Sequence, residues 1–210
     1  MRFQLGNSGP HMTSSRSTLV RVLSLILAVF AFSVTIRAHA DTSIIKNPGD
    51  HSRYYFEPEP HLILGYADAP GVASGAGIGF GFRGTVVLVN NGFVRTINNS
   101  VGIGFGIDWV HYSHRNDWCN TGPGGGCYSG SQSVNNFWIP VVMQWNFFLS
   151  RQWSVFGEPG LALRYTGWEN GHEWQPEPAF YVGGRWHFSD SMTLTLRASY
   201  PTISVGLSFM

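Results

Sequence analysis

Apolar and polar residues alternate along most of the chain from about residue 54 onwards. The segment 101–109 is typical, because its odd positions are apolar and bulky whereas its even positions are glycine or aspartate. The same two-residue period recurs in the segments 76–89 and 202–210. Side chains point alternately to the two faces of a β-strand, so this period predicts strands. The 3.6-residue period of helices is almost absent.

Eight segments share this period and predict an all-β fold, an eight-stranded antiparallel up-and-down transmembrane β-barrel. Their approximate ranges are 54–67, 76–89, 100–113, 136–149, 153–167, 173–188, 192–199 and 202–210. Most are long enough for a tilted spanning strand of ~9–11 residues. Barrels of this kind have short periplasmic turns and longer outer loops, so we expect the Gly-rich stretch 114–135 to form a loop on the outer surface.

The alternation by itself leaves open which face meets lipid, because a soluble, lipocalin-like barrel also alternates, with its apolar face inward. Here the bulky aromatic residues share the apolar face, and small residues share the other face, which suits the narrow lumen of eight strands. Charged residues make up 12% of the chain, against roughly 25% in ordinary soluble domains. We therefore place the apolar face in the membrane and keep a soluble periplasmic lipocalin-like binder as an alternative.

The N-terminal part has the layout of a secretory signal peptide. Basic residues precede the apolar run 22–36, and small residues stand three positions and one position before a cut in front of Asp41. Met12 is an alternative start to Met1. An exported chain of this type is expected in the bacterial outer membrane.

Three parts of the chain follow from this signal. Residues 1–40 are the predicted signal peptide, residues 41–53 a short periplasmic leader, and residues 54–210 the barrel. Four of the 13 basic residues and none of the 12 acidic residues precede residue 41, so the remainder has nine basic residues, 12 acidic residues and a net charge of −3. This balance indicates no nucleic-acid-binding surface.

The charged residues of the strands fall on the face assigned to the lumen. They are Glu57, Glu59, Arg83, Asp108, Glu158, Arg164, Glu177, Arg185 and Arg197. Buried ions must pair, because an isolated one costs several kcal/mol. A hairpin centred between residues 170 and 171 would set Arg164 opposite Glu177. The network either plugs the barrel or, in a porin-like alternative, lines a narrow gated water path.

Two cysteines, Cys119 and Cys127, lie close together in the Gly-rich stretch. An exported chain meets oxidising conditions, so we expect a local disulfide. No metal-ligand spacing stands out among the scattered histidines, and no cofactor motif is present. We therefore expect neither a metal nor a cofactor.

Strand number, signal peptide, lumenal charges and the C-terminal pattern together resemble the OmpA/OmpX-type eight-stranded outer-membrane barrels over residues 54–210. The ending 202–210 is similar to the signal read by the barrel assembly machinery, although Phe209 is followed by Met210. The resemblance implies outer-membrane lipids as surroundings and loops that can meet an extracellular ligand. Fold alone does not give function, and we expect a non-enzymatic role in envelope structure or surface interaction.

An enzymatic alternative rests on His111 and Ser113, which project to the same face of the third predicted strand. A serine beside a histidine is the start of a nucleophile–base pair, which also needs an orienting carboxylate such as Asp117 or Glu173. The stretch resembles part of the His-x-Ser-Asn motif of lipid A 3-O-deacylases, but His114 replaces the asparagine. The alternative is a lipid A acyl-ester hydrolase; otherwise His111 belongs to the interfacial aromatic girdle.

Prolines interrupt two of the predicted strands in the same way, as Pro58 and Pro60 in the first and as Pro176 and Pro178 in the sixth. Each proline removes a backbone donor, and two prolines spaced by two residues remove donors along the same side of a strand. Either these positions lie near strand ends that water can reach, or they mark a weakened seam through which a lipid tail enters sideways.

Overall fold

The computed structural model describes the chain from Thr42 onwards, apart from three short gaps. The described ranges are 42–66, 76–119, 127–169 and 171–210, with the backbone alone described for 114–119 and 127–132. The predicted signal peptide, residues 1–40, lies outside the described part of the chain.

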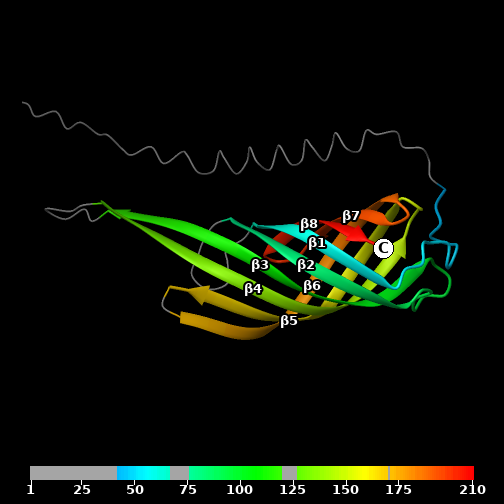
Figure 1. Ribbon diagram of the computed structural model, residues 1–210, viewed down its shortest axis with the longest axis horizontal. Helices are drawn as coiled ribbons and strands as arrows, with labels where there is room; N and C mark the ends of the chain where they lie inside the picture. The colour runs from blue at the N-terminus through cyan, green and yellow to red at the C-terminus, as the bar shows by residue number, and fades with distance from the viewer. Residues whose placement is uncertain (1–41, 67–75, 120–126, 170) are drawn as a thin grey trace, which may run out of the picture. The chain divides into compact units, whose positions relative to one another are not determined.

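Eight strands follow one another along the chain. They are β1 (Phe56–Gly65), β2 (Gly77–Val89), β3 (Asn99–Cys119), β4 (Cys127–Phe148), β5 (Trp153–Trp168), β6 (Gly171–Ser189), β7 (Met192–Ala198) and β8 (Thr202–Phe209). Each strand pairs with the next in antiparallel orientation, and β1 pairs with β8 to close the barrel (Figure 1). The predicted eight-stranded antiparallel barrel is confirmed. In the ranges described, no helix is long and apolar enough to cross a membrane.

The small residues of the inner face allow the strands to pack around a narrow lumen. Gly79 of β2 is the clearest case, since a Cβ atom there would lie 1.8 Å from the carbonyl oxygen of Trp109 on β3. A side chain at this position would have to displace the backbone of the neighbouring strand. Glycine on the lumen side of β2 is therefore required by the close approach of backbone.

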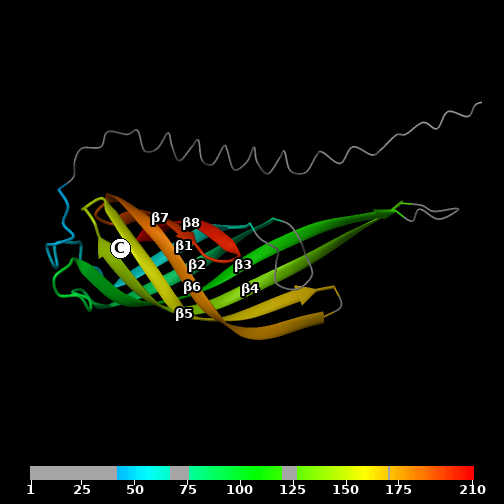
Figure 2. The ribbon, with the colours of Figure 1, turned by 180° about the vertical axis from the view of Figure 1, so that it is seen from behind.

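Strands β3 and β4 are much longer than the sequence pattern predicts. They have 21 and 22 residues, and their pairing continues as far as Cys119 opposite Cys127. The prediction of a loop over the whole of 114–135 is therefore wrong. This part of the hairpin consists mainly of polar residues and glycine and has no alternating apolar face, so the two-residue period did not predict it. Both views show β3 and β4 extending far beyond the short β7 and β8 (Figures 1 and 2).

Burial shows that the apolar face points outward. Phe80 and Leu161 are 60% and 68% exposed, whereas the carboxylate-bearing Glu158 on the opposite face is 0% exposed. A soluble lipocalin-like barrel has the reverse arrangement, so that alternative is wrong. An apolar exterior around a closed sheet is the arrangement that a lipid-embedded barrel requires.

The segment before β1 packs against the end of the barrel at which the β2–β3 and β4–β5 connections lie. Ile44 is buried and donates its backbone N–H to the carbonyl of Leu149 at 3.0 Å. His51 stacks on Phe148 with ring centroids 4.1 Å apart and donates from Nδ1 to Asn98 Oδ1 at 2.6 Å. The described part of the predicted leader, residues 42–53, is thus ordered against the end of the barrel.

Candidate functional site

The interior of the barrel holds the charged residues that the sequence assigns to the lumen. Of the nine, all except Glu177 are buried. They project inward because they occupy alternate positions of their strands, as Glu57 and Glu59 do on β1. The structure joins them into a central group, a separate pair of Glu57 and Arg185, and a smaller group toward the end with the long hairpins.

Arg197 of β7 and Glu158 of β5 form the middle of the central group. Arg197 Nε lies 2.9 Å from Glu158 Oε2, and Arg197 Nη1 lies 2.5 Å from Glu59 Oε1. Gln144 donates from Nε2 to the second oxygen of Glu158 at 2.7 Å. The guanidinium therefore bridges carboxylates from two strands, β1 and β5, that are not neighbours in the sheet.

Arg83 of β2 extends the group across the lumen. Its Nη1 lies 3.4 Å from Glu158 Oε2, and its Nη2 lies 3.1 Å from Asp108 Oδ2. His61 donates from Nε2 to the other oxygen of Asp108 at 2.9 Å. Glu158 thus has three charged or hydrogen-bonding partners and Asp108 has two, in each case from different strands, which is what burial of an ion demands.

Nearer the leader, Arg185 of β6 lies 2.9 Å from Glu57 Oε1 through its Nη2 atom. Two inward-facing aromatic rings support the guanidiniums. Arg185 lies 4.7 Å from the centroid of Phe156, and Arg83 lies 4.8 Å from that of Tyr181. These cation–π contacts were not anticipated from the sequence, although the strand period sets Phe156 on the same face as Glu158.

The smaller group contains Arg164 and Glu177, whose atoms Nε and Oε2 are 3.1 Å apart. The predicted register of this hairpin is wrong by two residues, because Arg164 pairs with Gln175 and Glu177 pairs with Ala162. The two charged residues meet diagonally, and Gln175 accepts a hydrogen bond from Arg164 Nη2. Glu177 Oε1 also accepts a hydrogen bond from Trp138 Nε1 at 2.7 Å.

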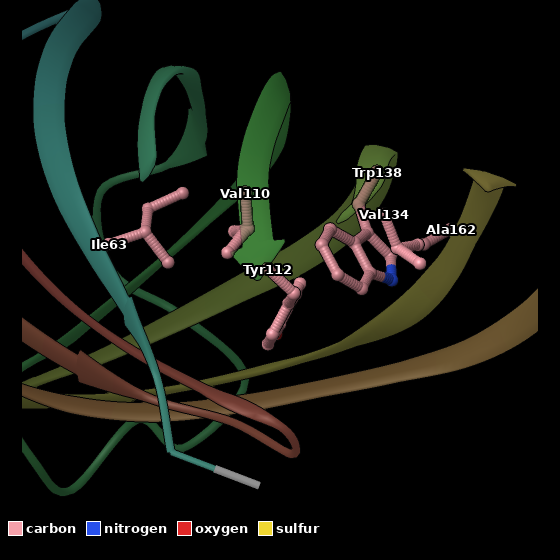
Figure 3. Close-up of a cluster of buried hydrophobic side chains, with 6 residues drawn as sticks. All are labelled: Ile63, Val110, Tyr112, Val134, Trp138 and Ala162. Atoms are coloured by element: carbon pink, nitrogen blue, oxygen red, sulfur yellow. The ribbon is translucent and has the colours of Figure 1, made fainter. Parts of the chain in front are cut away.

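Between the central charges and the end with the long hairpins, the wall of the lumen becomes apolar. Six buried side chains from β1, β3, β4 and β5 form one cluster, drawn in Figure 3. They are Ile63, Val110, Tyr112, Val134, Trp138 and Ala162. A pocket of about 210 Å³ adjoins four of them and reaches residues 178–181 of β6 and residues 199–202 at the β7–β8 turn.

The side wall of the barrel is incomplete next to this pocket. β6 pairs with β5 from Gly171 to Trp186, but its pairing with β7 ends at Val182 opposite Ala198. Within the described chain, residues 171–181 of β6 therefore have a strand neighbour on the β5 side only. The opening beside this stretch, where β7 is missing, is called the β6–β7 gap below. Pro176 and Pro178 lie along it. In the first strand, Pro58 and Pro60 likewise precede His61, where the pairing of β1 with β8 begins.

His111 and Ser113 both face outward on β3, as expected. His111 Nδ1 donates to Asn135 Oδ1 at 3.0 Å, whereas in a serine–histidine–carboxylate arrangement this atom contacts the acid. Glu173 is exposed on β6, and the side chain of Asp117 lies outside the described part. The described side chains thus bring no carboxylate to His111. They also contain no cluster of three or more ligating residues that could hold a metal ion.

The two cysteines occupy the end of the β3–β4 hairpin. The strand register pairs Cys119 directly with Cys127. Their side chains are not among those described, so the disulfide stays a prediction.

No protein-family model and no curated protein sequence matches the chain. Its fold is similar to solved structures of Ail, the attachment invasion locus protein of Yersinia pestis. The crystal structure of Ail with the heparin analogue sucrose octasulfate has 7% sequence identity and a TM-score of 0.42, over 73% of this chain and 92% of that chain. The backbone structure of Ail in a phospholipid bilayer nanodisc has 13% identity and a TM-score of 0.37, over 72% and 97% of the two chains.

With identities and TM-scores this low, the assignment of the fold rests on the strand pairing of this chain. Eight antiparallel strands in sequential order close on themselves, with charges inside and apolar side chains outside. The predicted resemblance is confirmed at the level of the fold: the chain is an eight-stranded barrel of OmpA/OmpX-type architecture.

Proposed function

We propose that this chain is a non-enzymatic, integral protein of the bacterial outer membrane that serves envelope structure or surface interaction. The inverted burial of the barrel is the observation that carries the proposal. Outward-facing Phe80 and Leu161 would cost free energy in water, at about 25 cal/mol per Å² of apolar surface, whereas lipid covers them. A bacterial outer membrane is the setting in which closed barrels of this size are used.

The first test compares the gel mobility of boiled and unboiled protein from the outer-membrane fraction in detergent. We expect the unboiled protein to migrate differently, because a closed barrel stays folded until it is heated. Extraction without detergent, together with equal mobility of both samples, would refute the proposal.

We further propose that the central charge group closes the lumen. Support comes from Arg197 of β7 and Arg83 of β2, whose guanidinium groups both form ion pairs with Glu158 of β5 inside the barrel. The alternative is a gated, porin-like path. Planar bilayers separate the two, since a plugged barrel conducts no more than a protein-free bilayer.

The long β3–β4 hairpin is the part that we assign to surface interaction. A spanning strand needs ~9–11 residues, and β3 and β4 have about twice that number, so their ends extend past the bilayer on the side opposite the leader. A protease added to intact cells should therefore cut between residues 114 and 132 and leave the rest of the barrel folded. Protection of this hairpin on intact cells would place it elsewhere.

We also infer a disulfide between Cys119 and Cys127, which would staple the tip of this hairpin. Directly paired residues of antiparallel strands have Cα atoms ~4.5–5.5 Å apart, within the range that a disulfide spans. Mass measurement of unreduced and reduced protein after alkylation tests the disulfide.

We also propose that the barrel assembly machinery inserts the chain into the membrane, because the apolar alternation of β8 suits recognition by this machinery.

A further inference from the structure

The pocket beside the β6–β7 gap differs from the rest of the interior. The central lumen holds a group of ion pairs, whereas apolar residues such as Ile63, Val110, Trp138, Ala162 and Phe180 make up more than half of the lining of this pocket. Its carboxylates have partners, since Glu177 contacts Arg164 and Asp108 contacts Arg83. The larger part of the pocket surface is therefore apolar, which suits an apolar occupant.

The same pocket reaches the outside of the barrel. Its lining includes Phe180, which points outward and is 62% exposed, and Tyr200 on the other side of the gap, which is 75% exposed. Residues on both sides of the gap and residues inside the barrel thus line one continuous space. Tyrosine and tryptophan gather at membrane–water interfaces, so Tyr200 and the neighbouring Tyr66 indicate that the gap opens near the level of the outer headgroups.

The edge of β6 at the gap is suited to contact with hydrocarbon. Two prolines two residues apart lack donors toward the same neighbouring strand. The pairing of β6 with β5 continues without a break past Pro176 and Pro178. This is expected if the two prolines replace residues whose N–H groups would have pointed toward the gap. Each unpaired backbone donor costs several kcal/mol in lipid, so an edge with fewer donors is less costly to leave open.

We propose that this pocket binds one acyl chain of an outer-membrane lipid, which enters sideways between β6 and the β7–β8 turn. The gap opens near the outer headgroups at the edge of the hydrocarbon, where acyl chains are the apolar molecules at hand. The pocket volume of about 210 Å³ exceeds the roughly 150 Å³ of an apolar cavity that accepts benzene, so it admits part of one chain. Asp108 and the charges around it bound the pocket toward the lumen centre and limit the depth of entry.

The test uses the full barrel in phospholipid nanodiscs that contain a lipid with a photoactivatable diazirine near the end of one acyl chain. After irradiation, mass spectrometry locates the cross-links. Labelling of Val110 or Trp138 reports a chain inside the pocket. Labelling around Phe80 and Ile107, which line a groove on the lipid-facing exterior, reports insertion into the bilayer.

The Ala162→Phe variant fills the pocket from inside, because Ala162 is buried and lines it. The matched control is Ala198→Phe, the same change at an exposed, outward-facing position of β7. If Ala162→Phe does not fold, Ala179→Phe fills the same pocket from β6, where the open gap gives a larger side chain more room. Heat-modifiable gel mobility shows which variants are folded.

We expect wild type and Ala198→Phe to be labelled both inside and outside, and the pocket-filling variant to lose at least nine-tenths of its interior labelling with exterior labelling unchanged. Exterior labelling alone in the wild type would overturn the acyl-chain site while leaving the membrane barrel intact. Interior labelling that persists in both pocket-filling variants would also overturn it. The inference rests on membrane insertion, and absence of labelling on both faces would refute both proposals.

Discussion

Glu158 is the position at which the interior charge group should be most sensitive to a single change. Its carboxylate is fully buried and contacts Arg197, Arg83 and Gln144. Replacement by glutamine keeps the size of the side chain and removes its charge. Two guanidiniums then lose a shared anion in a place that water does not reach.

The expected cost follows from the contacts that remain. Loss of one partner from a buried ion pair costs about 3–5 kcal/mol. In Glu158→Gln, Arg197 keeps Glu59 and Arg83 keeps Asp108, so we expect the lower end, about 3 kcal/mol. With a urea dependence of about 1–3 kcal/mol per M, the unfolding midpoint should fall by about 1–3 M.

The assay is urea unfolding in detergent micelles, followed by the fraction of heat-modifiable protein on unboiled gels. Glu173→Gln is the matched control, because Glu173 is exposed on β6, and we expect it to change stability by less than about 0.5 kcal/mol. Equal midpoints for the two variants would refute the view that the interior charges support one another.

Three further outcomes are expected. Burial lowers the pKa of the His51 imidazole below its usual 6.5, and a hydrogen bond to Asn98 offsets this only in part. The undocked leader therefore binds a proton first, so docking should be fully stable above pH about 6.5 and weaken as pH falls toward the lower pKa of the docked state. Amide protection at Ile44, measured by hydrogen exchange at several pH values, should show this loss, and His51→Phe should remove it. Ser113→Ala should leave the lipid A profile of expressing cells unchanged, whereas a restored acyl group would support the hydrolase alternative. Gly79→Ala should prevent the heat-modifiable form from accumulating, because its Cβ atom meets backbone at 1.8 Å.

The membrane part of the barrel could be predicted from the sequence, because lipid imposes a strict two-residue period on every spanning strand. The two faces of the segment 101–109 were predicted correctly for this reason, with Asp108 inside the barrel and Phe105 outside. Where lipid is absent the signal fades, and the extension of β3 to Cys119 was missed.

Contacts that depend on the register between two strands were harder to predict from the sequence. The meeting of Arg164 and Glu177 was predicted, but through a hairpin register that is wrong by two residues. The turn fell one residue earlier along the chain than expected, and long side chains bridge the resulting diagonal. Pro176 and Pro178 did indicate an unusual strand. That residues 171–181 of β6 lack β7 as a neighbour is shown only by the structure, in which β7 ends at Ala198.

The docked leader has a consequence for the order in which the protein folds. Ile44 and Ile45 bond to Leu149 and Asn98, which belong to connections formed much later in the chain. These partners come together only after β2 to β5 have assembled, since loop closure over such separations precedes any gain from the contact. Leader docking is therefore a late step, and protection of the Ile44 amide marks molecules in which β2 to β5 have already paired with one another.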